Sequence, residues 1–375
     1  MKKLLLLSAA AILTAGSAMA EVTEPTLTKD WEKTTDMPAA TNARWAAGYD
    51  GKLYLQNNAD AKVTVLDGTT ATDIVTGVNG WCLTVDEAGN LIISAGKFGT
   101  GSVDFRILPA GKTSASDMIT LSVTNPDGTN ANGRMDTFGR AIGDVMSEKG
   151  GAFYTLAQSQ TMISKIFVAN GAQVADKSVA INPGKEFAAS TNSNLSVVQP
   201  INSDVNATDN VVWMSRSTQN SFCKLDGTAY TEYSYQPDAS VNSTAGGDIV
   251  TLGGVVYTIE PAGTSASNGF VIVDRTNDKV VYTFNETGVI AGGIYSAYVG
   301  FEKIDDTKAN VYHYAPGMNA TKYTFEVPAV PTAIESIEVE NAPVEYYNLQ
   351  GVKVANPENG LFIKKQGAKT TKVVL

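Results

Sequence analysis

Few side chains in this sequence have the types and spacing that acid–base, nucleophilic or metal chemistry requires. The 375 residues include one histidine, His313, and two cysteines, Cys82 and Cys223. His313 stands in a strand pattern with no second histidine to complete a metal pair or a Ser-His-Asp relay, so we interpret it as structural. The cysteines belong to separate predicted strands, and we expect buried free thiols rather than a disulfide. The sequence therefore predicts no catalytic residue, no metal site and no cofactor.

Acidic residues leave an enzymatic alternative open. In a repeat fold the two carboxylates of a glycosidase would come from distant parts of the chain, so no local spacing would reveal them. Asp86, Asp144 and Asp248 lie near predicted inner strands, where acids more often cap turns. We expect turn caps at these positions, and a carbohydrate-active enzyme, either a glycosidase or a lyase, stays the alternative to a binding protein.

Aromatic, arginine and amide side chains point to binding chemistry. Several of them directly precede predicted inner strands, and strands that surround a channel would bring them to one mouth of it. Aromatic faces supply contact area there, and guanidinium and amide groups supply directional hydrogen bonds to a sugar or a peptide. The predicted ligand-binding residues are Arg44, Trp45, Asn79, Trp81, Arg140 and Tyr295. The alternative is that Trp45 and Trp81 pack between neighbouring repeats.

The elements that must position these side chains are short strands. From about Glu24 to Pro328, Val/Ile/Tyr/Phe/Thr-rich runs alternate with Gly, Asn, Asp and Ser clusters, which is typical of an all-β chain. A unit with two hairpin arms recurs, most clearly at 46–68 and 83–93, and its turns repeat at a mean of roughly 52 residues. An antiparallel unit of this size is a blade. We therefore predict an all-β β-propeller with six blades, with seven blades or a two-sheet sandwich as the alternatives.

One of these units resembles a known family. The segment Leu83–Ile93 contains the pattern Val-Asp-x-x-Gly-Asn-Leu, which resembles the inner hairpin of NHL-type six-bladed propellers. The resemblance implies the propeller fold and carries no information about function.

The N-terminus has the pattern of a secretory signal peptide. Lys2 and Lys3 precede an apolar run, and Ala18-Met19-Ala20 forms a small-residue cleavage site. We predict cleavage after Ala20, which would take two positive charges from a chain whose formal net charge is −10. A surface this acidic excludes nucleic acid as a partner. No later stretch is long and apolar enough to be a transmembrane segment.

The C-terminal part differs in composition from the rest. We predict a signal peptide at 1–20, a propeller domain at 21–328, a linker at 329–331 and a C-terminal β segment at 332–375. Lysines crowd the end of this last segment, and three short strands are predicted in it, at Val344–Tyr347, Gly360–Lys364 and Thr371–Leu375.

This tail also resembles a known family. The order Tyr347–Val354, Gly360–Ile363 and Lys372–Val374 resembles the C-terminal sorting domain of proteins exported by the type IX secretion system. The resemblance implies the secretion machinery as a partner and delivery to the cell surface or the medium. Without a working sorting signal, the protein would stay in the periplasm.

The expected function follows from the predicted export of the protein and from the predicted ligand-binding residues at the channel mouth. We expect an exported cell-surface or secreted binding protein that takes a glycan or peptide ligand at the channel mouth, and we favour binding over catalysis. The alternatives are the carbohydrate-active enzyme already named and a structural or adhesive surface protein, which would expose a broad apolar patch.

Overall fold

The computed structural model divides the chain into two compact units, Met1–Pro328 and Ala329–Leu375. The residues it describes are 23–39, 45–95, 104–126, 128, 135, 137–156, 162–182, 197–207, 211–216, 220–225, 230–232, 247–261, 267–287, 298–329, 343–367 and 369–375. The predicted signal peptide and most of the predicted linker lie outside these residues.

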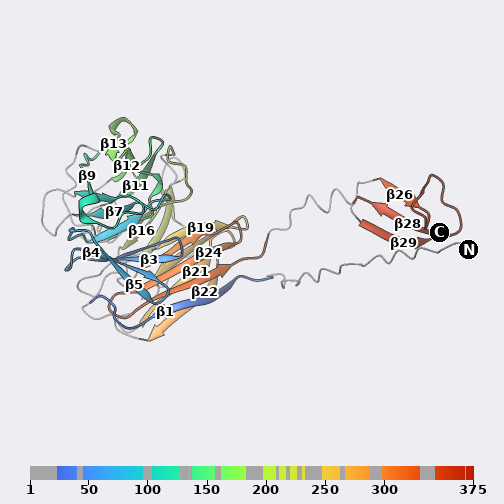
Figure 1. Cartoon of the computed structure of the whole chain (residues 1–375), viewed down its shortest axis with the longest axis horizontal. Helices are drawn as coiled ribbons and strands as arrows, with labels where there is room; N and C mark the ends of the chain where they lie inside the picture. Colours follow the sequence, from blue (N-terminus) through green and yellow to red (C-terminus); the bar gives the residue numbers. More distant parts are fainter. Residues whose placement is uncertain are drawn as a thin grey trace, which may run out of the picture. The chain divides into compact units, whose positions relative to one another are not determined.

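The first unit is built from antiparallel sheets that follow one another along the chain (Figure 1). Sheet 1 contains β2 (Ala46–Tyr49), β3 (Lys52–Asn57), β4 (Lys62–Asp67) and β5 (Thr70–Val75). Sheet 2 contains β6 (Cys82–Val85), β7 (Leu91–Ser94), β8 (Phe105–Leu108) and β9 (Ile119–Leu121). Sheet 3 contains β10 (Ile142–Asp144), β11 (Gly150–Thr155), β12 (Ile163–Ala169), β13 (Ala172–Gln173) and β14 (Val179–Ile181).

Three more sheets continue the same pattern. Sheet 4 contains β15 (Val197–Pro200), β16 (Val211–Arg216), β17 (Asn220–Leu225) and β18 (Tyr230–Glu232). Sheet 5 contains β19 (Asp248–Leu252), β20 (Val255–Pro261), β21 (Ser267–Asp274) and β22 (Lys279–Thr287). Sheet 6 contains β23 (Tyr298–Lys303), β24 (Lys308–Ala315), β25 (Asn319–Glu326) and, from the other end of the chain, β1 (Thr26–Lys33). Two short 3₁₀ helices, η1 (Ala115–Asp117) and η2 (Ala175–Lys177), accompany sheets 2 and 3.

The pairing of β1 closes the ring. β1 runs antiparallel to β25, with Thr26 opposite Glu326 and Lys33 opposite Ala320, so the blue and orange ends of the unit lie side by side in Figure 1. The ammonium group of Lys322 lies 2.6 Å from the Asp30 carboxylate across this pair. A succession of antiparallel meanders closed in this way is a β-propeller. The predicted all-β propeller fold is therefore confirmed, while the number of blades in the whole chain stays a prediction.

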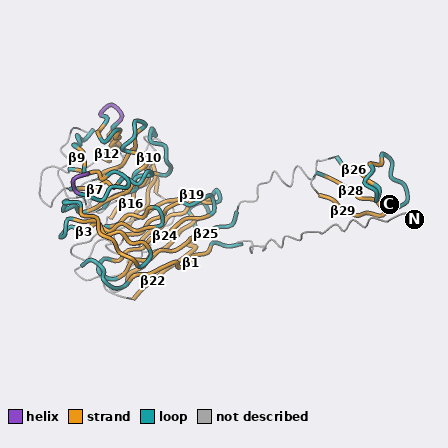
Figure 2. Tube along the Cα trace, in the orientation of Figure 1, coloured by secondary structure: helices purple, strands orange, loops and turns teal. Residues whose placement is uncertain are grey.

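Local sequence explains the tight hairpins within the sheets. Asp50 and Gly51 connect β2 to β3 and have φ angles of 52° and 72°. Two residues with positive φ match the twist of the flanking strands, and Asp-Gly adopts this geometry at low cost. Figure 2 shows that strands dominate the described chain and that turns of this kind join them.

The sheets pack face to face around apolar side chains. Trp45, just before β2, is 1% exposed, and its ring meets Tyr298 of sheet 6 edge to face, with 5.3 Å between the ring centres. Gly48 allows the same two sheets to approach closely, because a Cβ atom there would stand 2.2 Å from the Tyr312 ring. Phe105, Phe138 and Phe153 form a second aromatic cluster, between sheets 2 and 3.

The histidine and one cysteine lie in this core. His313 is fully buried in β24, and burial lowers its pKa to about 4 despite the nearby Glu32 carboxylate. Cys82 is buried at the start of β6, and its thiol donates to the Met135 carbonyl oxygen at 3.5 Å. The backbone of Cys223 belongs to β17, but its side chain lies outside the described part of the chain.

The described part of the second unit contains one sheet, with strands in the order β27-β26-β28-β29. Its strands are β26 (Val344–Tyr347), β27 (Lys353–Val354), β28 (Leu361–Gln366) and β29 (Lys369–Val374). Three of them overlap the strands predicted from the sequence, and the short β27 was not predicted. Among the described residues of the whole chain, no helix has the length and hydrophobicity needed to cross a membrane.

Candidate functional site

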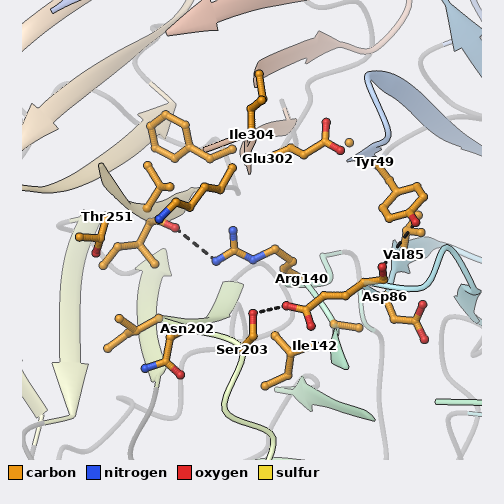
Figure 3. A pocket seen from close by; sticks show the side chains of 18 residues that line it. Tyr49, Val85, Asp86, Arg140, Ile142, Asn202, Ser203, Thr251, Glu302 and Ile304 are labelled. Carbon is orange, nitrogen blue, oxygen red and sulfur yellow. Dashed lines mark hydrogen bonds between the residues drawn. The ribbon is translucent and has the colours of Figure 1, made fainter. Parts of the chain in front are cut away.

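The axis of the propeller holds a cavity of about 660 Å³. Each of the six sheets contributes residues of its first strand, or of the loop beside that strand, to the lining. Figure 3 shows side chains from these different sheets facing one open space. The polar and charged lining residues include Tyr49, Asp86, Glu87, Arg140, Ser203 and Glu302.

The cavity lies mainly where the first strands end. Tyr49 is the last residue of β2, Glu87 follows β6, and Ser203 follows β15. The residues predicted from the sequence instead precede these strands, and Arg140 is the one among the described residues that reaches the lining. Side chains after a predicted inner strand were the available signal, but the sequence alone does not show which mouth of the channel is open.

The structure brings one of the sequence-predicted residues, Arg140, into the cavity lining. Trp45 is buried in the core, where its indole Nε1 donates to the Phe138 carbonyl oxygen at 3.1 Å, so its faces are covered by protein. Asn79 is exposed and Trp81 is partly buried, and neither is among the residues that line this cavity. Arg44 and Tyr295 lie outside the described residues.

Arg140 reaches across two neighbouring sheets. Its Nη2 donates to the carbonyl oxygens of Pro200, at 2.9 Å, and Ile249, at 3.2 Å. Its backbone N–H donates to the Gln199 side chain at 2.7 Å, and Gln199 in turn donates to the Gly247 carbonyl at 2.8 Å. These bonds join sheets 3, 4 and 5 next to the axis. The Arg140 side chain keeps 28% exposure, and Figure 3 shows its guanidinium group in the middle of the lining residues.

A buried carboxylate balances the charge of Arg140. Asp248 in β19 is 2% exposed, and its Oδ1 lies 3.6 Å from the Arg140 Nη2. The Asp248 carboxylate also accepts the backbone N–H groups of Ile249 at 2.7 Å and of Phe301 at 2.8 Å. Burial raises the pKa of Asp248, whereas Arg140 and the two N–H donors lower it. Asp248 thus joins sheet 5 to sheet 6 and holds Arg140 in place.

Two adjacent acids act differently at the end of β6. Asp86 is 1% exposed and accepts four hydrogen bonds, from the backbone N–H groups of Ala88, Asn90 and Val145 and from the Asn90 amide. Burial raises the pKa of Asp86, against the effect of these four donors. It caps a turn, as we expected, and it also joins sheet 2 to sheet 3.

Glu87 is the exposed member of this pair of acids. Its carboxylate accepts the backbone N–H of Gly143 at 2.9 Å and a short hydrogen bond from the Ser203 hydroxyl. The hydroxyl of Tyr49 donates to the Glu87 backbone carbonyl at 3.4 Å. Glu87 therefore connects sheets 1, 2, 3 and 4 at the rim of the cavity, and its carboxylate still faces solvent.

Glu302 completes the ring of contacts. Its carboxylate accepts the backbone N–H groups of Asp50 and Gly51, the latter at 3.1 Å. It also accepts the Asn310 amide at 2.7 Å and the Tyr312 hydroxyl at 2.5 Å. Sheet 6 is therefore joined to sheet 1 by a carboxylate that is already fully hydrogen-bonded. Asp144 accepts the Asn90 amide at 2.9 Å and the Met146 N–H at 2.9 Å, so it stabilises turns in sheets 2 and 3.

The arrangement has clear chemical consequences. Asp86, Asp248 and Glu302 each accept hydrogen bonds both from their own sheet and from a neighbouring sheet, so they join blades. Arg140 and Glu87 are partly exposed and retain capacity for further hydrogen bonds. Among the described residues, no three His, Cys, Asp or Glu side chains are grouped so that they could hold a metal ion.

Comparisons with known proteins give likenesses of fold alone. No protein-family model and no curated protein sequence matches the chain. One similar solved structure is AofleA from Arthrobotrys oligospora, at 8% identity, with 94% of this chain and 92% of that chain covered and a TM-score of 0.48. Another is the PQQ-bound aldose sugar dehydrogenase from Streptomyces coelicolor, at 11% identity, with coverage of 82% and 100% and a TM-score of 0.46.

A third similar structure is a subtype N10 neuraminidase-like protein of A/little yellow-shouldered bat/Guatemala/060/2010. It is 10% identical, with coverage of 82% of this chain and 99% of that chain and a TM-score of 0.43. None of these similarities assigns a ligand or an activity to this chain.

Proposed function

We propose that this protein is an exported binding protein, and that a small polar glycan or peptide ligand occupies the cavity at the propeller axis. The observation that carries this proposal is one cavity of about 660 Å³ lined by all six sheets. That volume lies within the range of small-molecule sites, which are about 300–1,000 Å³ and combine apolar walls with a few oriented polar groups.

The state of the acids supports binding rather than hydrolysis. A glycosidase needs one carboxylic acid that can protonate a leaving group and a second that can act as base or nucleophile. Asp86 and Asp248 accept backbone N–H groups from neighbouring sheets and are almost fully buried. Two carboxylates that hold blades together are poorly suited to exchange protons with a substrate.

The surface of the first unit supports a cavity site over an adhesive one. Its exposed large apolar side chains, among the described residues, are Val75 and Ile304, at 60% and 54% exposure. Two isolated side chains do not make the broad apolar patch that a docking surface requires.

A thermal-unfolding screen of the mature full-length chain tests the proposal. A ligand that binds only the native state raises the melting temperature with concentration. We expect at least one small glycan or peptide to give a dose-dependent rise, and Arg140→Gln to abolish it. Arg106→Gln is the matched control, because Arg106 in β8 lies outside the cavity lining and its Nη1 bonds only the neighbouring Phe105 carbonyl. No rise with any ligand, or an equal rise in both variants, would remove the axial cavity as the site.

We further propose that the C-terminal unit is a sorting element read by the secretion machinery. Support comes from the three-part sequence order in one compact unit: Tyr347–Val354 runs from the end of β26 through β27, Gly360–Ile363 leads into β28, and Lys372–Val374 belongs to β29. Deletion of 332–375 should leave the protein in the periplasm of its native host, as fractionation would measure. Normal delivery of the shortened chain to the cell surface or medium would contradict this role.

A further inference from the structure

The axial cavity offers an unused hydrogen-bond donor at its centre. Arg140 employs Nη2 toward Pro200 and Ile249, whereas its Nη1 and Nε bond to no atom of the described residues. A guanidinium group carries five N–H donors in a fixed fork. Because Asp248 lies 3.6 Å from Nη2, the positive charge of Arg140 is already opposed inside the protein. Asp248 offsets part of this charge, so Arg140 offers a ligand mainly directional hydrogen-bond donation.

The rim of the same cavity offers an unused acceptor. The Glu87 carboxylate receives two hydrogen bonds, from Gly143 and Ser203. A carboxylate has about four lone-pair sites, so Glu87 can accept further donors. By contrast, Asp86 and Glu302 each already accept four hydrogen bonds. A ligand that uses both groups must therefore accept hydrogen bonds from Arg140 and donate hydrogen bonds to Glu87.

The charges that surround the cavity disfavour ions of either sign. An anionic group would meet Arg140 only in the company of Asp86, Glu87 and Glu302. A cationic group would have to enter beside Lys303, which also lines the cavity, and beside the Arg140 guanidinium, which keeps 28% exposure. An uncharged ligand avoids the repulsion from these charges. Two adjacent hydroxyl groups on such a ligand can accept hydrogen bonds from Arg140 and donate hydrogen bonds to Glu87.

The walls add an apolar side to this requirement. Tyr49 lines the cavity from the end of β2 and is partly exposed, with its hydroxyl anchored on the Glu87 carbonyl. Aliphatic lining comes from Val85, Ile142, Ile201, Val250 and Ile304. A ring with hydroxyl groups at its edges and C–H groups on its faces fits such a mixture, because an aromatic side chain gives large contact area at low entropic cost.

From these four features we infer that the ligand of the axial cavity is a neutral sugar, held by Arg140 and Glu87 through neighbouring hydroxyl groups and packed on Tyr49. This inference rests on the proposed binding function and specifies its ligand class.

The test compares neutral sugars with their acidic and basic derivatives. Calorimetric titration of the mature full-length chain would use glucose, galactose and mannose, each beside its uronic acid and its amino sugar. We expect at least one neutral sugar to bind, with its charged counterparts at least tenfold weaker. We also expect Arg140→Gln and Tyr49→Ala to weaken that sugar at least tenfold. Arg106→Gln and Tyr54→Ala should match the unsubstituted protein, because neither residue lines the cavity.

The outcomes separate the two proposals. Equal or tighter binding of an acidic or amino sugar would overturn the neutral-sugar inference and leave the binding function standing. Binding of a peptide but of no sugar would do the same. If neither sugars nor peptides bind, both proposals fail. The comparison among sugars uses the unsubstituted protein, so it is decisive even if a variant does not fold.

Discussion

The two compact units of this chain are both antiparallel β structure, yet they differ sharply in how they bury apolar side chains. In the first unit, whole strands are buried, for example β11 (Gly150–Thr155) and β6 (Cys82–Val85). In the second unit, no residue whose side chain is described falls in the buried class. Tyr346 and Phe362 are only partly covered there, and Leu349 and Val374 are 57% and 78% exposed.

The difference follows from the number of neighbours that a sheet has. A sheet has two faces, and each blade of a propeller covers both of them with the blades on either side. One sheet by itself can gain only the contacts between side chains of adjacent strands. The first unit is therefore stabilised by contacts between sheets as well as within them, and the following predictions test that distinction.

Removal of β1 should have the largest effect. Deleting 21–33 removes the fourth strand of sheet 6 and exposes the edge of β25. The N-terminal segment would then no longer pair with β25 to close the ring. We expect loss of the cooperative thermal transition, measured by circular dichroism. Asp30→Asn is the milder control, because it weakens the contact with Lys322 but keeps the strand. A deletion variant that melts like the full chain would show that closure by β1 is dispensable.

The substitution Trp45→Ala should have the second largest effect on stability. The substitution removes a side chain that is 1% exposed and contacts Tyr298 between two sheets, and such deletions cost about 3–5 kcal/mol of unfolding free energy. Urea unfolding measures this cost. Phe362→Ala in the second unit should leave the midpoint of the first unit unchanged. If Trp45→Ala instead abolished ligand binding at little cost in stability, the ring would be a binding platform and not core.

Acid should destabilise the first unit through His313. Its pKa is about 4 in the folded protein and 6.5 in the unfolded chain, so between these pH values the unfolded state binds more protons. Stability contributed by neutral His313 is present above pH 6.5 and is lost as the pH falls to 4. The difference corresponds to about 3 kcal/mol.

Urea midpoints measured from pH 7 to pH 4 would check this value, with His313→Gln as the reference that cannot titrate. We expect the unsubstituted protein to lose more stability than His313→Gln over this range. Parallel curves for the two proteins would show that His313 keeps its ordinary pKa.

The smallest effect is expected at the exposed pair of the second unit. Lys353 lies 2.5 Å from the Glu345 carboxylate, and both side chains keep substantial exposure. Exposed ion pairs contribute little because water and salt screen them. Lys353→Ala should thus change amide exchange in β26 only slightly, and the change should vanish at high salt. Strongly increased exchange would mean that this pair organises the sheet.

Local structure could be predicted from the sequence because it depends on residues that are close together along the chain. The hairpin at Asp50-Gly51 and the strand Val344–Tyr347 were predictable from turn chemistry and from short β-rich runs. The role of Asp86 as a turn cap was also predictable, since its partners Ala88 and Asn90 are close in sequence.

The candidate site was less predictable, and Trp45 and Arg140 show why. Both residues precede inner strands and were equivalent in sequence, yet Trp45 turns into the space between sheets while Arg140 lines the cavity. Tyr49, Glu87 and Glu302 were not selected, because nothing local distinguishes the open end of the channel from the packed one.

The sequence by itself thus determined the β character, the turns and the repeated unit of the first domain, all of which depend on residues a few positions apart. Only the tertiary structure decided which side chains meet at the axis. Arg140 and Asp248 are more than a hundred residues apart, as are Glu87 and Ser203. Such contacts depend on how each blade is rotated and packed against the next, and this geometry is set by the whole ring.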